Sequence, residues 1–360
     1  MTIADILRQR LQNQWLVDTK AQSPPQVVRQ LLATQAQDYL GSLWAIGQRM
    51  NGADETSVEQ AVADGSIVRT WPMRGTLHFV AAEDVKWLSD FLAPRVLPKT
   101  RSIHLNAGLD AAVFKKSERV IVKALEKEPM LTRDALYERL EKNGIATANS
   151  RGLHITGYLA VNGLICLGPR NGKQHTFVMR DEWLRNVKHL QPDDTLSTLA
   201  LRYFAGHGPA TVQDFAWWTG LSLTESREAI ARAGSGLVES KLKDYTYYQT
   251  QTSSSNTGSA SAKLKATHLL PAFDEFTVAY KERTLMLPSG QQHRSAMEVL
   301  SPGISINGLL VGAWSRTLTK KGVELQLKPF TKLTDAQRSK ISAQAKRYAR
   351  FVGAGKAILQ

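Results

Sequence analysis

Cysteine is nearly absent from this 360-residue chain, which contains a single one, Cys166. One thiol cannot form an internal disulfide, and it cannot build a cysteine-rich metal site. Cys166 lies in the apolar run Leu164-Ile165-Cys166-Leu167, which is typical of a buried strand. We therefore expect a structural role for this cysteine and no metal centre.

Long hydrophobic runs are missing as well. No apolar stretch approaches the roughly 18 residues that a membrane-spanning helix requires. The first ten residues predict an amphipathic helix rather than a signal peptide, because charges interrupt the apolar positions. These features predict a cytoplasmic protein with no membrane partner.

Several motifs that define enzyme chemistry do not occur. The sequence has no P-loop, no Gly-x-Gly-x-x-Gly at a strand–helix junction, no His-Glu-x-x-His and no Ser-His-Asp context. His207 has no second metal ligand at a suitable spacing, so we expect it to satisfy the carbonyls at a helix end. No cofactor is predicted.

Two adjacent carboxylates, Asp274 and Glu275, are candidates for acid–base work. Adjacent side chains on a strand point in opposite directions, so at most one of them could face a site. Solvation at the surface, or an ion pair with Lys281 or Arg283, is the preferred interpretation.

Positive charge, in contrast, is abundant. The chain has 46 Lys and Arg against 32 Asp and Glu, a formal net charge of +14. Such a surplus favours a polyanionic partner, because neutralising phosphates releases condensed counterions. A merely basic, solvated surface is the alternative.

The order of predicted elements recurs along the chain. Three successive segments each place helices before a pair of β-prone runs, which is the order of a winged helix-turn-helix. The third copy has β-prone runs at 237–242 and 245–250, and further strands are expected at 268–270, 276–279, 308–315 and 323–327. The fold class is therefore α+β, with tandem winged helices followed by a small β module.

These patterns suggest five parts. They are a first winged-helix domain (1–115), a second (116–190), a third with a Ser/Gly-rich linker (191–262), a β-rich module (263–330) and a basic C-terminal helix (331–360). The linker composition is confined to residues 251–262. The last helix is amphipathic, so it is expected to dock on the body of the protein or on phosphate.

Two glutamines at 35 and 37 stand between two apolar-periodic segments, at a predicted helix junction. An extended backbone there would point both amides the same way, because side chains alternate along a strand. Without further information, two polar residues in a surface loop are the simpler interpretation. Asp38 follows directly and is a candidate base if the loop turns it inward.

Cations and polar groups cluster at the first two predicted hairpins. They are Arg69, Trp71, Arg74 and His78 in the first, and Arg170, Asn171 and Lys173 in the second. A wing is an exposed ribbon that can lie along phosphates, which suits DNA binding. A charged edge that prevents strand pairing is the alternative for any single residue.

Several of these segments together resemble one family, the AlkZ/YcaQ-type winged-helix DNA glycosylases. The matching stretches are Gln35-Ala36-Gln37-Asp38-Tyr39, Arg69-Thr70-Trp71-Pro72-Met73-Arg74-Gly75-Thr76-Leu77-His78, His207-Gly208-Pro209-Ala210-Thr211, Asp214-Phe215-Ala216-Trp217-Trp218 and Leu270-Pro271-Ala272-Phe273-Asp274-Glu275. The resemblance extends from about residue 20 to residue 330.

The resemblance implies a C-shaped monomer that binds duplex DNA with alkylated bases and excises N-alkylated purines, in some members from interstrand crosslinks. The family signature is Gln-x-Gln in the AlkZ branch and Gln-x-Asp in the YcaQ branch. By resemblance, Gln35 and Gln37 are then the catalytic residues, with Asp38 and His78 as possible auxiliaries. The alternative is a non-catalytic winged-helix DNA-binding protein, such as a regulator.

Overall fold

The computed structural model describes residues 1–251, 265–319 and 322–360. The chain forms two compact units, one built from residues 1–58 and 196–360 and the other from residues 59–195. We call them the discontinuous unit and the inserted unit. In the described residues no helix is long and apolar enough to cross a bilayer. Most of the expected linker at 251–262 lies outside the described residues.

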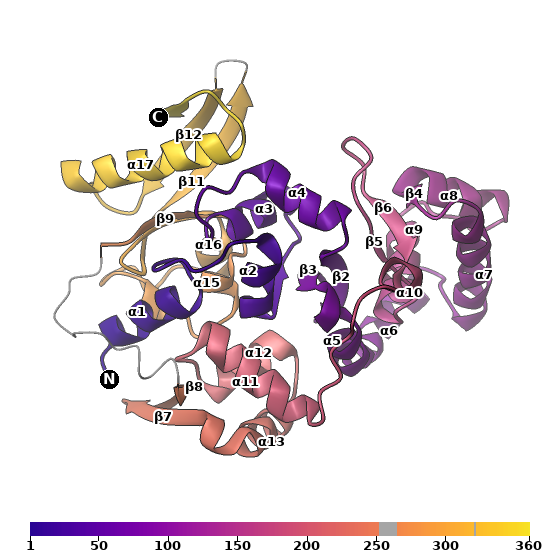
Figure 1. Cartoon of the computed structure of the whole chain (residues 1–360), viewed down its shortest axis with the longest axis horizontal. Helices are drawn as coiled ribbons and strands as arrows, with labels where there is room; N and C mark the ends of the chain where they lie inside the picture. The colour runs from indigo at the N-terminus through magenta and orange to yellow at the C-terminus, as the bar shows by residue number, and fades with distance from the viewer. Residues whose placement is uncertain (252–264, 320–321) are drawn as a thin grey trace. The chain divides into compact units, whose positions relative to one another are not determined.

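The discontinuous unit begins with short helices around one small strand (Figure 1). These elements are α1 (Ile3–Asn13), α2 (Pro24–Leu31), β1 (Ala33–Gln35), α3 (Tyr39–Gly47) and α4 (Glu55–Ala63), the last of which leads into the inserted unit. Consecutive prolines at 24 and 25 fix the first turn of α2, where no backbone N–H is needed. Leu32, with a φ of +62°, ends that helix and turns the chain into β1.

The second half of the discontinuous unit returns after residue 195 with three helices and a hairpin. They are α11 (Thr195–His207), α12 (Val212–Thr219), α13 (Leu223–Ala233), β7 (Leu237–Leu242) and β8 (Tyr245–Thr250). Capping boxes at Thr211 with Asp214 and at Ser222 with Glu225 set the starts of α12 and α13. The two strands expected at 237–242 and 245–250 are confirmed.

A five-stranded sheet in the order β13-β12-β11-β10-β9 completes this unit. Its elements are β9 (Thr267–Leu270), α15 (Glu275–Val278), α16 (Ala296–Leu300), β10 (Gly303–Ile306), β11 (Leu309–Thr319), β12 (Gly322–Pro329), α17 (Asp335–Phe351) and β13 (Ala357–Leu359). The strand expected at 276–279 is wrong: Asp274 caps a short helix there instead, its side chain accepting a hydrogen bond from the Phe276 N–H.

The C-terminal helix α17 docks on the body of the discontinuous unit, as its amphipathic pattern predicts (Figure 1). Its buried Tyr348 and Phe351 pack against the Trp44 ring of α3, with centroid separations of 5.2 and 5.1 Å. The Arg347 guanidinium donates to the carbonyls of Gln48 and Met50 at 2.9 and 2.8 Å. These contacts hold α3 against α17. The residues just before α3, Gln35 to Asp38, are called the glutamine segment below.

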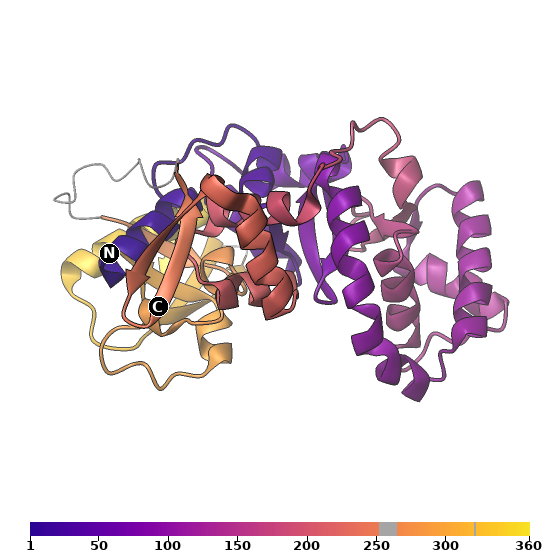
Figure 2. The ribbon, with the colours of Figure 1, turned by 90° about the horizontal axis from the view of Figure 1, so that it is seen from below.

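The inserted unit combines helices with short strands (Figure 2). Its strands are paired in the order β3-β2-β5-β6-β4. Its elements are β2 (Ile67–Met73), β3 (Thr76–Ala81), α5 (Val85–Leu92), α6 (Leu97–Asn106), α7 (Ala111–Lys127), β4 (Leu131–Thr132), α8 (Arg133–Lys142), α9 (Arg151–Val161), β5 (Ile165–Leu167), β6 (Thr176–Met179) and α10 (Arg180–Trp183). Cys166 is buried in β5 as expected, and burial raises the pKa of its thiol to about 12. The chain as a whole has a mixed α+β fold.

Candidate active site

Gln35 is the last residue of β1, and its side chain is only 8 % exposed. Its backbone N–H donates to Glu275 Oε1 at 2.8 Å. Its side-chain oxygen Oε1 accepts a hydrogen bond from the backbone N–H of Gln37 at 3.2 Å. Gln35 is therefore held both through its main chain and through its amide.

Gln37 and Asp38 lie beyond the strand and are exposed. The strand β1 ends at Gln35, and the chain then bends at Gln37 and Asp38 into α3, so the two amides do not share one extended strand. Asp38 caps that helix: its Oδ1 accepts the Gly41 N–H at 3.2 Å. A Cβ added to Gly41 would lie 2.4 Å from Asp38 Oδ2, so only glycine leaves room for this cap.

Glu275 is the residue that sequence reasoning assigned to the surface, and it is 1 % exposed. Besides the Gln35 N–H, its carboxylate accepts the Trp218 indole N–H at 2.9 Å through Oε2. His207 Nε2 lies 3.3 Å from the same oxygen. A buried carboxylate is costly unless it is hydrogen-bonded, and the Gln35 and Trp218 N–H donors meet that requirement.

His207 occupies the last position of α11, and the expectation that it satisfies an end carbonyl is confirmed. Its Nδ1 lies 3.2 Å from the Tyr203 carbonyl oxygen, and its ring stacks on the Tyr203 ring at 4.9 Å. The contact with Glu275 was not foreseen. Tyr280 donates from its hydroxyl to the His207 carbonyl at 2.8 Å, and burial raises the pKa of this phenol.

Asp274 is also buried, so its expected place at the surface is wrong, as is its pairing with Lys281 or Arg283. Its carboxylate forms a two-pronged ion pair with Arg49, with N–O distances of 2.7 and 2.9 Å. Gln48 Nε2 donates to the same carboxylate at 3.0 Å. The pair joins the end of α3 to the start of α15, and so fixes Glu275 relative to the glutamine segment.

The inserted unit holds the first hairpin, and two of its candidate DNA contacts are buried. Arg69 is 4 % exposed and Trp71 is 9 % exposed, so the exposed wing expected for them is wrong. The physical reason is that β2 pairs with β3 on one edge and β5 on the other. Trp71 packs in the hydrophobic core of this unit.

Arg69 Nη1 lies 3.0 Å from His175 Nε2. Burial, together with the nearby Arg69 charge, lowers the pKa of His175 to about 4. A neutral His175 can then accept a hydrogen bond from the guanidinium. Arg69 therefore has a structural partner within the unit rather than an open path to phosphate.

His78 is fully buried in β3, which removes it as an accessible proton donor. Its Nε2 lies 3.1 Å from Arg74 Nη2, and its Nδ1 lies 2.9 Å from the Thr76 carbonyl oxygen. Arg74 itself is half-buried in the turn, with a φ of +56°. The auxiliary catalytic role expected for His78 does not fit these contacts.

At the second hairpin, Asn171 and Lys173 are exposed, and Arg170 is half-buried. Arg170 forms an ion pair with Glu59 of α4. Asn171 exchanges backbone hydrogen bonds with Gln174 at 2.9 and 3.1 Å, which closes the turn that its Asn-Gly sequence predicts. Lys173 is exposed at the tip.

Glu275 is a candidate that the sequence analysis raised but assigned to the surface. A signal was present, since Asp274 is a good helix cap and Glu275 follows directly at the start of a helix, not a strand. In a helix, the rule that adjacent side chains point in opposite directions along a strand does not apply, so it no longer limits Asp274 and Glu275 to one buried carboxylate. Its partners, however, are 240, 68 and 57 residues away along the chain.

Comparisons with known proteins find matches over almost the whole chain. A family model described as DNA glycosylase AlkZ-like matches residues 28–351. A curated protein from Streptomyces sahachiroi, named interstrand DNA cross-link repair glycosylase, is 26 % identical over 359 residues, covering 94 % of this chain and 93 % of its own. The solved structure of Streptomyces sahachiroi DNA glycosylase AlkZ matches with a TM-score of 0.81 and 23 % identity, covering 100 % of this chain and 99 % of that one.

Proposed function

The chain belongs to the AlkZ-like family of DNA glycosylases, and we propose that it hydrolyses the bond between deoxyribose and N7- or N3-alkylated purines in duplex DNA. In this proposal Gln35 and Gln37 are the catalytic residues, and they position a water molecule at C1′ of the damaged nucleotide. The alternative function, a DNA-binding regulator without catalysis, is disfavoured because the chain belongs to a family of DNA glycosylases.

The observation that carries the proposal is the fixed position of Gln35. Its N–H is bound by the buried Glu275 carboxylate, and its Oε1 is bound by the Gln37 N–H. Groups held in place before the substrate arrives need no reorganisation in the transition state, which is the main source of electrostatic catalysis. Gln37 follows two residues later and is exposed, so its amide is accessible from solvent.

Neutral amides suit this chemistry. A purine alkylated at N7 or N3 is cationic, so it leaves as a neutral base with the electrons of the C1′–N9 bond and needs no general acid. The water oxygen forms the new bond to C1′, and its proton passes to solvent. An amide carbonyl can hold that water, while an amide NH₂ can hold a phosphate or a base edge. The task is one of proximity and charge stabilisation.

Interstrand crosslinks are a second proposed substrate class. The support is the curated relative, whose name states that it is a crosslink repair glycosylase. A guanine linked to the opposite strand cannot rotate fully out of the helix, so its excision requires an open site. The exposure of Gln37 and Asp38 is compatible with such a site.

We further propose that α7, β4, α8, α9, β5 and β6 form a winged helix. The support is the order of these elements and the pairing of β4 with β6 beside the β5–β6 hairpin. Lys173 at the tip of that hairpin is the exposed cation that remains a candidate phosphate contact.

One assay tests the proposal directly. Purified protein is incubated with a duplex that carries a single N7-methylguanine, and alkali then cleaves any abasic site. Strand cleavage by the wild type, and none by a Gln35→Ala/Gln37→Ala double variant, is the expected result. Tight binding without any base release would instead favour the regulator. A duplex with a nitrogen-mustard crosslink, resolved on a denaturing gel, tests the second substrate class.

A further inference from the structure

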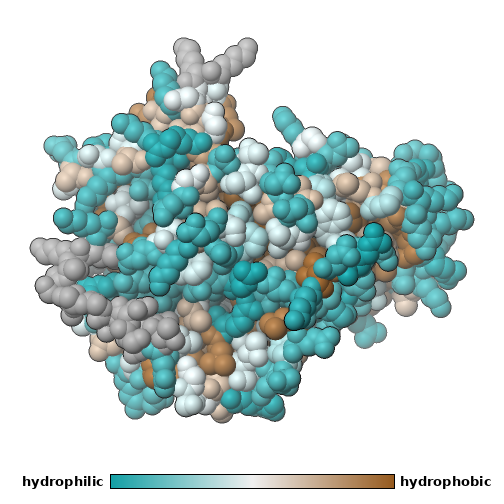
Figure 3. All heavy atoms as spheres, in the orientation of Figure 1, coloured by the Kyte–Doolittle hydropathy of each residue, from teal (hydrophilic) through white to brown (hydrophobic). Residues whose placement is uncertain are grey.

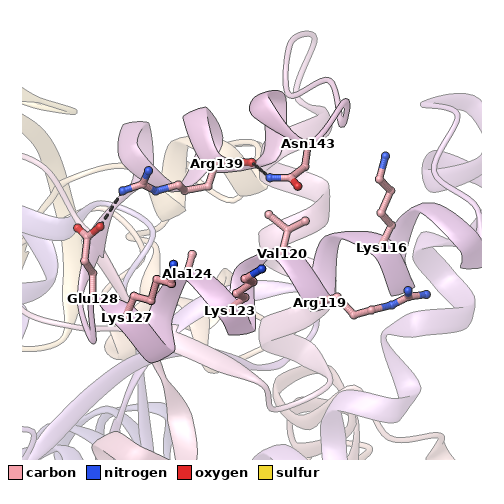
Figure 4. Close-up of a pocket in the computed structure, with 9 residues that line it drawn as sticks. All are labelled: Lys116, Arg119, Val120, Lys123, Ala124, Lys127, Glu128, Arg139 and Asn143. Atoms are coloured by element: carbon pink, nitrogen blue, oxygen red, sulfur yellow. Dashed lines mark hydrogen bonds and ion pairs between the residues drawn. The ribbon is translucent and has the colours of Figure 1, made fainter.

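A groove of about 560 Å³ runs between α7 and α8 in the inserted unit, far along the chain from the glutamine segment. Figure 4 shows its lining: side chains of α7 form one wall, and Arg139 and Asn143 of α8 form the other. The full lining is Lys116, Arg119, Val120, Lys123, Ala124, Lys127, Glu128, Arg139 and Asn143.

The charge of this lining is strongly one-sided. Five of the residues are cations, and the single carboxylate, Glu128, is already bound by Arg139 at 2.7 Å. Lys116, Arg119, Lys123 and Lys127 are exposed and, among the described residues, take part in none of the ion pairs. Four positive charges therefore face the groove without compensation.

The four cations form a line along α7. They recur at intervals of three, four and four residues, so they share one face of the helix. With a rise of 1.5 Å per residue, the eleven steps from Lys116 to Lys127 span about 16 Å. A single small anion could contact only part of such a line, whereas a linear polyanion could contact all of it.

The helix that carries the line is held firmly. The opposite face of α7 buries Phe114, Ile121 and Leu125 in the hydrophobic core of the inserted unit. Val120 and Ala124, which lie between the cations in the sequence, also line the groove. On the face shown in Figure 3, hydrophilic residues cover the region of α7 and α8, so an apolar partner finds little surface there.

We propose that this groove binds the sugar–phosphate backbone of duplex DNA, as a contact additional to the glutamine site and to the Lys173 hairpin. Duplex DNA carries about one negative charge per 1.7 Å of helix axis, which suits a row of cations rather than a point site. The inference rests on the proposed function only in taking duplex DNA as the partner. Phosphate contacts position the protein without reading sequence, so the groove binds damaged and undamaged duplex alike.

The test compares pairs of lysines with the same change in charge. Lys123→Gln/Lys127→Gln removes two charges from the groove, and Lys99→Gln/Lys188→Gln removes two exposed charges elsewhere in the same unit. Binding of a 30-base-pair undamaged duplex is measured by fluorescence anisotropy from 50 to 300 mM salt. The groove variant is expected to lower the slope of log K against log salt by about 1.8 and the affinity at 0.15 M salt by roughly tenfold or more. The control pair leaves the slope near that of the wild type.

Two further arms make the result decisive. Lys123→Arg/Lys127→Arg keeps both charges and is expected to retain the slope, and thermal unfolding shows that every variant is folded. Equal slopes for the groove and control variants would overturn the proposal. So would unchanged duplex binding together with lost flotation on phosphatidylserine vesicles, which would point to a membrane surface. Because the duplex is undamaged, absent base release from N7-methylguanine would refute the proposed function without affecting this result.

Discussion

The side chain of Glu275 binds the main chain of Gln35: Oε1 accepts the Gln35 N–H at 2.8 Å, across 240 residues of sequence. The other carboxylate oxygen accepts the Trp218 indole, so one buried group links β1, α12 and α15. Glu275 is thus a positioning residue for the glutamine segment.

Replacing the glutamines is expected to remove catalysis but not binding. Gln37→Ala, and to a lesser degree Gln35→Ala, lower the single-turnover rate of base release from N7-methylguanine by roughly 10²–10³, as for loss of one preorganised group. Duplex affinity stays nearly unchanged, because neutral amides add little to phosphate attraction. Gln292→Ala, at an exposed glutamine outside the site, serves as the control. Undiminished excision by the double variant would refute the catalytic assignment.

Glu275→Gln is expected to destabilise the fold and slow base release together. A glutamine offers one acceptor oxygen where two N–H donors now bind, so one buried donor is left unsatisfied at a cost of about 1–3 kcal/mol. Urea unfolding measures that cost. Trp218→Phe removes one of the two donors. The Glu275→Gln/Trp218→Phe double variant should therefore lose less unfolding free energy than the sum of the losses of the two single variants. Strict additivity would show that the two contacts are not coupled.

Asp38 is expected to act as a helix cap rather than as the base. Asparagine is as good a cap as aspartate but cannot accept a proton in this role, whereas alanine removes the cap at a cost of about 1 kcal/mol. Asp38→Asn should therefore keep stability and most of the excision rate, and Asp38→Ala should lose stability. A 10²-fold slower reaction with a fully stable Asp38→Asn protein would identify Asp38 as the base after all.

The protein is expected to select bases that already carry positive charge. N7-methylguanine and N3-methyladenine are released, while uracil and hypoxanthine are not, because neutral leaving groups need a proton donor worth roughly 10²–10⁴ in rate. His78 is buried and bound to Arg74, so it cannot readily supply that proton. Side-by-side alkaline cleavage assays on duplexes of one sequence test this, and efficient uracil release would contradict the mechanism.

Stability is expected to fall as the pH drops from about 6.5 towards 4. His268 is fully buried in β9, and burial lowers its pKa from 6.5 to about 4, so in this range the unfolded chain binds a proton that the folded chain does not. The shift corresponds to a loss on the order of 3 kcal/mol, complete near pH 4. His175 acts in the same direction. Urea unfolding at several pH values measures the slope, and His268→Gln should flatten it; an unchanged slope would assign the effect elsewhere.

Local sequence signals account for much of the fold. Thr211, Ser222 and Thr334 each begin a helix with a capping box, and the Asn171-Gly172 turn closes where its sequence indicates. Such features depend on residues three or four positions apart, so they are visible in the sequence. The candidate glutamines were found because they resemble a family motif, not because their geometry could be foreseen.

Long-range pairing explains the errors. Arg69 looked like an exposed wing residue because its partner, His175, lies 106 residues further along. Asp274 and Glu275 looked like surface carboxylates because the groups that stabilise them inside the protein come from α3, α11 and α12. Charged residues are usually exposed, and the few that are buried are paired with a hydrogen-bonding partner. When that partner is distant in the sequence, it is known only once the fold is known.

The discontinuous unit has a consequence for the order in which the protein matures during synthesis. Residues 59–195 leave the ribosome as a continuous segment, whereas the unit around Gln35 needs residues from both before and after that segment. The Gln35 N–H has no Glu275 to bind until the 240 residues that separate the two have been translated. A nascent or prematurely terminated chain can thus contain the whole inserted unit before it can form the contact between Gln35 and Glu275. Such a fragment would carry the proposed phosphate-binding groove without the proposed catalytic site.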